Sequence, residues 1–181
     1  PSVDEENEPE IIQREDGSFY FDPEGVKTNV HEFLTNRKEG PSVIHGAPVL
    51  MGNSIFVAGG GDLWWGKNFA WLKRYDVPRQ PTAVPKLAWE YPLRKHVMAT
   101  PAVWQGMVFI ADCEGGFHCV DAETGGPLWT HEIKGQAWGS PLVADGKVYL
   151  GTRGSAFYVF DAAREKRVRS GLALNSPVSA T

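Results

Sequence analysis

Residues 100–129 contain the feature that most constrains the fold, a series of short apolar runs separated by glycine-containing turns. The runs begin at residues 100, 107, 117 and 128, and the turns lie at 105–106, 114–116 and 123–126. Glycine readily adopts the positive φ that a tight hairpin requires, so each turn is expected to reverse the chain. This stretch therefore predicts a four-stranded antiparallel meander.

The same pattern recurs along the chain. Pro141 stands where Pro101 stood, and Asp161 follows Pro141 at the spacing that separates Asp121 from Pro101. A weaker copy begins at residue 47 and a truncated one at residue 176. Four strands in each unit, with units of roughly 35–55 residues, are typical of propeller blades. The 20 glycines, 13 prolines and 7 tryptophans agree with a turn-rich all-β chain.

The repeats predict an all-β, partial β-propeller of about three to four blades, each a four-stranded antiparallel sheet. The best helical candidate, residues 162–169, is a blade turn without its glycines. The predicted division is an acidic lead-in with possible outer strands of a preceding blade (1–40), a divergent blade (41–95), a central blade (96–136), a third blade (137–174) and the first strand of the next (175–181). Within the lead-in, Asp22 would correspond to Asp161, and residues 30–34 to an edge strand.

Charge and hydropathy exclude two classes of function. The formal net charge is −4 and no basic tract stands out, whereas binding to a nucleic-acid backbone favours a basic surface. No apolar run approaches the roughly 18 residues that a membrane-spanning helix needs. The first residues show neither an initiator Met nor a signal-peptide pattern, so a processed protein or a fragment is expected.

The central turn carries a family resemblance. Residues 121–129, Asp-Ala-Glu-Thr-Gly-Gly-Pro-Leu-Trp, closely resemble the tryptophan-docking repeat of quinoprotein (PQQ-type) β-propellers. In that family the Asp and Thr fix the turn, the Gly leaves its peptide plane open, and a Trp of the neighbouring blade stacks on it. The resemblance implies structural docking roles for seven positions: Asp121, Thr124, Gly125, Trp129, Trp89, Asp76 and Asp161. The third blade departs from the pattern, because its turn lacks the Gly and the Trp.

The resemblance also has implications for blade number, cofactor and function. Such rings usually have eight blades, or seven in relatives, so the chain is expected to be completed by the rest of a propeller or by another chain. Catalytic members hold PQQ and calcium with an adjacent Cys pair, a Trp floor and Glu, Asn and Asp ligands; this sequence has no adjacent Cys pair. Other members, such as the bacterial outer-membrane assembly lipoprotein, are non-catalytic.

We therefore predict a non-catalytic binding or scaffold propeller without a cofactor. It would be periplasmic or otherwise extracytoplasmic and would recognise a protein or a small ligand through its loops. The alternative is part of a PQQ- and calcium-dependent quinoprotein oxidoreductase whose cofactor site lies on blades outside this sequence.

One stretch exceeds what a blade requires. Residues 59–68 open with three glycines, which cost backbone entropy, in what is predicted to be a loop. The loop offers aromatic, acidic, basic and amide groups to a ligand: Asp62, Trp64, Trp65, Lys67 and Asn68. In the alternative, the tryptophans pack over a neighbouring blade and the polar groups face water.

The two cysteines flank one hairpin. Cys113 and Cys119 would face each other across a three-residue loop, where a disulfide is feasible, but would lie on opposite faces with a two-residue loop. Two separate buried thiols are the other alternative. His118 is next to Cys119 in the sequence, yet this spacing matches no recognised metal-ligand set.

The residue types of a nucleophilic triad also occur, as Ser140, His131 and Asp161. Ser140, however, occupies the repeated Ser/Thr-Pro position that it shares with Thr100 and Ser176. A position that recurs in every repeat indicates a requirement of the blade and not a unique nucleophile.

Overall fold

The computed structural model describes residues 11–13, 19–21, 44–62, 67–78 and 84–179. The chain divides into two compact units, residues 1–40 and 41–181. In the first unit, β1 (Ile11–Gln13) pairs antiparallel with β2 (Phe19–Phe21). The edge strand expected at 30–34 and the role expected of Asp22 lie outside the described residues, and the assignment of β1 and β2 to a preceding blade stays a prediction.

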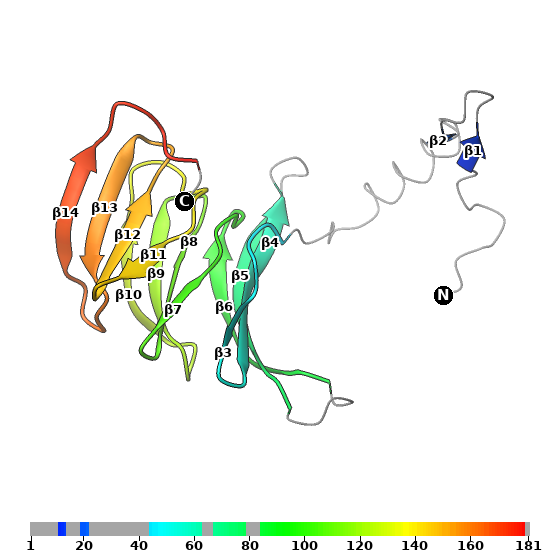
Figure 1. Cartoon of the computed structure of the whole chain (residues 1–181), viewed down its shortest axis with the longest axis horizontal. Coiled ribbons are helices and arrows are strands. Elements are labelled where there is room, and N and C mark those ends of the chain that lie inside the picture. The colour runs from blue at the N-terminus through cyan, green and yellow to red at the C-terminus, as the bar shows by residue number, and fades with distance from the viewer. Residues whose placement is uncertain (1–10, 14–18, 22–43, 63–66, 79–83, 180–181) are drawn as a thin grey trace. The chain divides into compact units, whose positions relative to one another are not determined.

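The described residues of the second unit form three four-stranded antiparallel sheets, each with its strands in sequence order (Figure 1). The first sheet contains β3 (Val49–Met51), β4 (Ser54–Asp62), β5 (Lys67–Asp76) and β6 (Lys86–Arg94). The second contains β7 (Ala102–Trp104), β8 (Met107–Ala111), β9 (Gly116–Asp121) and β10 (Pro127–Glu132). The third contains β11 (Leu142–Ala144), β12 (Lys147–Gly151), β13 (Ala156–Asp161) and β14 (Val168–Ala173). The predicted all-β, partial propeller is confirmed.

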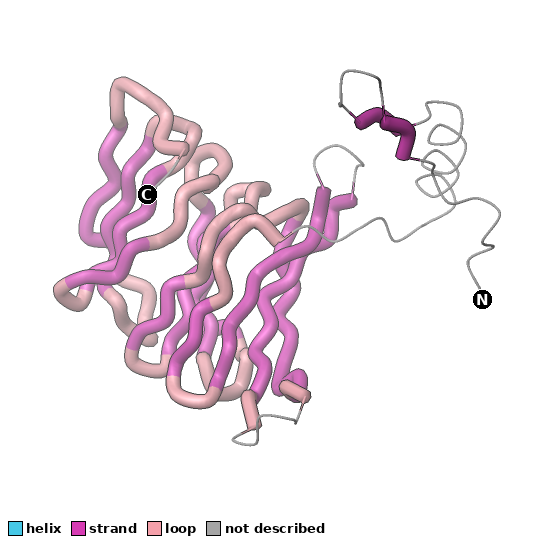
Figure 2. Tube along the Cα trace, turned by 45° about the vertical axis from the view of Figure 1, so that its right-hand side comes forward, coloured by secondary structure: helices cyan, strands magenta, loops and turns pink. Residues whose placement is uncertain are grey.

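Helices are absent from the described residues, as the tube in Figure 2 shows. The helical candidate at 162–169 is instead a bend that leads into β14. No helix among the described residues is long and apolar enough to cross a membrane.

The repeated glycine turns explain the meander. In the central sheet, Gln105 and Gly106 have φ values of 44° and 76°, and in the third sheet Asp145 and Gly146 have values of 49° and 65°. Two consecutive positive φ angles define the type I′ hairpin, whose twist matches that of the flanking strands. The same two-residue turn therefore joins the first and second strands of both sheets.

The central sheet is buried on both faces, because the other two sheets pack against it. Every residue of β8 is buried, whereas β6 and β14 are mostly exposed. One apolar cluster lies between the first and central sheets and includes Phe56, Leu72, Val108, Ile110 and Val120. The other lies between the central and third sheets and includes Phe109, Phe117, Trp129, Leu150 and Phe160.

The glycines at 59–61 differ from expectation, because they belong to β4 and not to a loop. The strands pair as far as Asp62 and Lys67, so the connection between them is residues 63–66. A Cβ on Gly59 would lie 3.1 Å from the Trp71 ring, and one on Gly61 would collide with the Lys95 carbonyl oxygen. The missing side chains thus serve close packing.

The end of the described chain follows the third sheet closely. The Val178 N–H donates to the Thr152 carbonyl at 3.0 Å, and residues 174–179 contain no strand. The first strands of the three sheets begin directly after Pro48, Pro101 and Pro141, so the strand expected at 175–181 would begin after Pro177. Residues 178 and 179 are not in a strand and 180–181 lie outside the described residues, so this strand stays a prediction.

Candidate functional site

The turn after β9 is held by its own side chains. Asp121 Oδ1 accepts hydrogen bonds from the Thr124 N–H at 2.8 Å, the Thr124 hydroxyl at 3.0 Å and the Glu123 N–H at 3.0 Å. These bonds, the Thr124 N–H foremost, together with Arg164, lower the pKa of Asp121 to about 2. Asp121 is thus a carboxylate at neutral pH, and it fixes a turn in which Gly125 has a φ of 73°.

Trp89 of the first sheet packs on that turn. Its indole N–H donates to the Ala122 carbonyl at 3.2 Å. A Cβ added to Gly125 would lie 2.7 Å from Cγ and Cδ2 of the indole, so this contact requires a residue without a side chain. The structure therefore brings Trp89, Asp121, Thr124 and Gly125 together.

Arg74 reinforces the same contact, although the sequence analysis did not predict a role for it. Its guanidinium donates to the carbonyls of Ala122 at 3.0 Å and Glu123 at 3.1 Å, and it forms ion pairs with Glu123 at 2.7 Å and Asp76 at 2.9 Å. Asp76, expected to correspond to Asp121, thus acts through Arg74. Arg74 sits two residues before Asp76, where the central sheet has Cys119.

The central and third sheets meet in a second contact. The Trp129 indole N–H donates to the Ala163 carbonyl at 2.9 Å, and its ring stacks on Phe160 with centroids 5.7 Å apart. Asp161 accepts a hydrogen bond from Arg169 at 2.6 Å, and Arg164 reaches back to Asp121 at 2.6 Å. The third turn lacks the Gly and the Trp of the repeat, and ion pairs of Arg164 and Arg169 take their place.

The repeated Ser/Thr-Pro position links the first strands of neighbouring sheets. Thr100 Oγ1 accepts from the Ala47 N–H at 2.9 Å, and Ser140 Oγ accepts from the Thr100 N–H at 3.0 Å. The hydroxyl of each sheet thus binds the backbone of the sheet before it. This repeated contact accounts for the recurrence without a catalytic role.

A buried polar cluster, which the sequence did not reveal, also joins the first and central sheets. Asp112 is fully buried; its Oδ1 accepts from the N–H groups of Glu114 at 3.0 Å and Gly116 at 2.8 Å. Its Oδ2 accepts from Arg94 Nε at 3.2 Å and lies 3.0 Å from His118 Nε2. The Tyr91 hydroxyl lies 3.1 Å from His118 Nδ1.

The groups around Asp112 stabilise its carboxylate in the ionised form. Burial opposes ionisation of Asp112, but the hydrogen bonds from His118 and Gly116 and the charge of Arg94 outweigh it and lower the pKa of Asp112 to about 2. Because an ionised carboxylate can only accept, His118 donates to Asp112 from Nε2, and its Nδ1 faces the Tyr91 hydroxyl. The corresponding residue of the third sheet, Thr152, accepts from the Ala156 N–H at 3.3 Å. This Asp/Thr match between repeats was the available signal.

The cysteines are two separate buried thiols. Cys113 Sγ donates to the Ala137 carbonyl at 3.6 Å, whereas Cys119 lies in the apolar cluster opposite Phe109. Burial raises the pKa of each thiol to about 12, so neither is a thiolate at neutral pH. Within the described ranges, no three His, Cys, Asp or Glu side chains are grouped as metal ligands.

The predicted ligand-binding loop is only partly described. Trp64 and Trp65 lie outside the described residues. Asp62 and Lys67 occupy paired positions at the ends of β4 and β5, and the Asn68 carbonyl accepts from the Lys95 N–H at 3.1 Å. The ligand-binding role of this loop stays a prediction.

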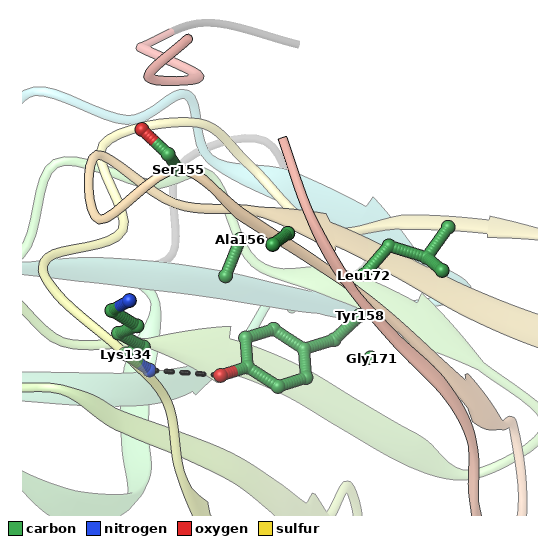
Figure 3. A pocket seen from close by; sticks show the side chains of 7 residues that line it. Lys134, Ser155, Ala156, Tyr158, Gly171 and Leu172 are labelled. Atoms are coloured by element: carbon green, nitrogen blue, oxygen red, sulfur yellow. Dashed lines mark hydrogen bonds between the residues drawn. The ribbon is translucent and has the colours of Figure 1, made fainter. Parts of the chain in front are cut away.

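A pocket of about 200 Å³ lies beside the outer strands of the third sheet (Figure 3). The Tyr158 hydroxyl accepts from the Lys134 N–H at 3.0 Å across it. Its lining is Lys134, Ser155, Ala156, Tyr158, Gly171, Leu172 and Ala173. The sequence analysis did not single out any of these residues as a site.

Comparison with known proteins adds a family and a set of similar folds. The family model for the outer membrane protein assembly factor BamB matches residues 61–170. No curated protein matches significantly. Among solved structures, a europium-containing methanol dehydrogenase has a TM-score of 0.56 at 19% identity, covering 74% of this chain and 26% of its own. BamB from Moraxella catarrhalis has a TM-score of 0.57 at 18% identity, covering 74% and 41%.

The computationally designed Ika4 protein has a TM-score of 0.60 at 14% identity, covering 79% of this chain and 81% of its own. At these identities the structural likeness shows the fold alone. The chain spans about a quarter of the methanol dehydrogenase, and 20% of a quinohemoprotein alcohol dehydrogenase from Pseudomonas putida HK5.

Proposed function

Because the chain belongs to the PQQ-repeat β-propeller family, we propose that it is part of a non-catalytic binding or scaffold propeller that recognises a protein or a small ligand through its surface. One observation carries this proposal. The carboxylates at the sheet contacts are engaged by donors of the chain itself, so they hold the blades together. Asp112 accepts from Arg94, His118 and two backbone N–H groups, and Asp121 from Arg164 and its own turn.

Two carboxylates at the sheet contacts, Asp112 and Asp121, are already used by hydrogen bonds and ion pairs within the chain. Calcium takes six to eight oxygen ligands, each with a lone pair directed at the ion. The oxygens of Asp112 and Asp121 are directed at N–H groups and cations instead. We therefore propose that this part of the propeller supplies no cofactor ligand. An oxidoreductase role would need blades other than these.

We propose further that the protein acts outside the cytoplasm and is completed by the rest of a ring or by another chain. The face of the third sheet that points away from the central sheet supports completion. On that face Leu142 and Leu172 are 58% and 54% exposed, and Tyr149 packs against Phe157. Apolar sheet faces of this kind are normally covered. The extracytoplasmic placement is supported by the matched family, whose description is an outer membrane protein assembly factor.

Two measurements test the proposal. Absorption spectra of the purified protein should show no co-purifying quinone, and a bound quinone chromophore would contradict the non-catalytic role. Cross-linking followed by affinity capture should recover a partner. The double variant Trp64→Ala/Trp65→Ala tests whether the 59–68 loop contributes: it should lose that partner while its circular dichroism stays unchanged, and an unaltered partner list would exclude the loop.

A further inference from the structure

We propose that the outer edge of β14 binds an extended segment of a partner protein as an added β-strand, with an apolar side chain of that segment in the pocket beside Tyr158 and an acidic residue toward each of its ends. This deepens the proposed binding role, on which it rests, by naming the place and the chemistry of the partner. Three features at the outer edge of the third sheet carry it: a backbone edge that no described strand covers, the pocket, and two lysines without a carboxylate partner among the described residues.

The backbone of β14 has a free side. The Leu174 N–H donates to the Ser155 carbonyl at 2.7 Å, and Leu172 pairs with Phe157. Hydrogen-bonding direction alternates along an antiparallel strand, so the N–H and C=O groups of Gly171 and Ala173 point away from β13. No described strand pairs with β14 on that side. Such an edge is a template for an incoming strand.

The other two outer strands are protected where β14 is not. The Lys95 N–H donates to the Asn68 carbonyl, so by the same alternation Pro92 occupies an outward position of β6, where it offers no N–H. In β10 the carbonyl of Thr130 accepts from the Lys166 ammonium at 3.2 Å, and the strand begins with Pro127. Proline and lysine are common devices that discourage strand addition. Strand β14 contains neither.

The pocket opens at the same edge. Gly171 and Ala173, whose backbone groups point away from β13, both line it, and the Tyr158 ring lies across from Gly171 (Figure 3). A Cβ on Gly171 would lie 3.6 Å from the Tyr158 ring, so the absence of a side chain leaves the ring accessible. The volume of about 200 Å³ is several times the ~30 Å³ share of one water molecule. Alternate side chains of an added strand would face this pocket.

Two lysines set the charge of the partner. Arg164, Arg167 and Arg169 are paired with Asp121, Glu165 and Asp161. In contrast, Lys134 and Lys166 have no carboxylate partner among the described residues. Lys134 and Ala173, at the end of β14, both line the pocket. Lys166, whose ammonium also donates to the Thr130 carbonyl, lies two residues before the start of β14. Glu132, close to Lys134 in sequence, is taken by Arg94 at 3.1 Å. An acidic residue toward each end of the bound segment would complement both.

The probe is a fluorescein-labelled, amidated octapeptide of alternating Val and Thr with Glu at both ends, titrated with the 181-residue chain and followed by fluorescence anisotropy. We expect saturable binding. N-methylation of the peptide amides that face β14 should abolish binding, whereas methylation of the alternate amides should leave it intact. Gly171→Val should fill the mouth of the pocket and weaken binding by about tenfold or more. Lys134→Gln should weaken it and reduce its dependence on salt.

Ser170→Val is the matched control, because it adds bulk to the adjacent residue, whose side chain points to the opposite face of the same strand. It should bind as the unmodified protein does. The proposal is overturned if the octapeptide shows no saturable binding, if both methylated peptides behave alike, or if Gly171→Val binds normally. Should Gly171→Val not fold, the methylated peptides and Lys134→Gln decide. Capture of a partner that the octapeptide and Gly171→Val do not affect would refute this edge while sparing the proposed binding function.

Discussion

Replacing Gly125 with Ala tests whether the contact of Trp89 with the central turn holds the first two sheets together. Gly106 provides the matched control. Both glycines have nearly equal positive φ angles, 73° and 76°, but a Cβ on Gly106 meets nothing within 4 Å. Each substitution pays the same backbone penalty of about 1–2 kcal/mol for an L-residue in the left-handed region. The difference between the two variants therefore measures the indole contact.

The size of that difference follows from what Trp89 would lose. A Cβ 2.7 Å from Cγ and Cδ2 must displace the ring, and the indole N–H would leave the Ala122 carbonyl, at a net loss of about 1 kcal/mol. Tryptophan buries about 150–250 Å², and exposing a third of it at ~25 cal/mol per Å² costs roughly 1.5 kcal/mol. Gly125→Ala should therefore lower the free energy of unfolding by about 2–3 kcal/mol more than Gly106→Ala.

Urea denaturation followed by circular dichroism measures both variants, and tryptophan emission reports the displaced indole. Gly146→Ala, with a φ of 65° and an equally open Cβ position, gives a second control. Equal losses in Gly125→Ala and Gly106→Ala, within about 0.5 kcal/mol, would refute the view that Trp89 packs on this turn.

Three further predictions follow from the contacts between the sheets. The pKa of Asp112 is about 2 in the folded protein against an ordinary 3.8, so its stabilisation is complete above that ordinary value and is lost as the pH falls toward 2. Asp112→Asn should remove about 2 kcal/mol of the stability change across that range, which denaturation at several pH values would measure; an unchanged pH profile would contradict it. Cys113 and Cys119, with pKa values raised to about 12 by burial, should not react with Ellman's reagent at pH 8 until urea unfolds the chain, and rapid native labelling would refute their burial. Arg74→Ala removes the partner of two backbone carbonyls and two carboxylates and should cost about 2–4 kcal/mol in thermal or urea unfolding, whereas a loss under 0.5 kcal/mol would show that water replaces it.

Local chemistry made the sheets predictable. Glycines at type I′ turns, prolines at strand starts and the repeated Asp of each unit act over a few residues, so their spacing showed four strands per unit. The Ser/Thr-Pro position could be recognised as structural because it recurs, and Thr100 and Ser140 indeed bind the backbone of the sheet before them. The glycines at 59–61 were wrongly predicted to lie in a loop. They allow close packing against Trp71 and the Lys95–His96 backbone, which no local pattern reveals.

The candidate sites were less predictable for the same reason. The docking positions around Asp121 were predicted through a resemblance, but Arg74 was not, since the turn that it binds lies almost fifty residues away. The polar cluster joins Tyr91 and Arg94 of one sheet to Asp112 and His118 of the next. Such a cluster exists only once two blades are packed together.

The sequence by itself determined the units: the number of strands in each and their antiparallel order. These depend on interactions between residues close in the chain. The tertiary structure decided which carboxylates are occupied by hydrogen-bond donors, which thiols are buried and which strand edge and pocket are left open. Those properties depend on which faces of distant strands meet, and burial and hydrogen-bond partners are defined only by that meeting.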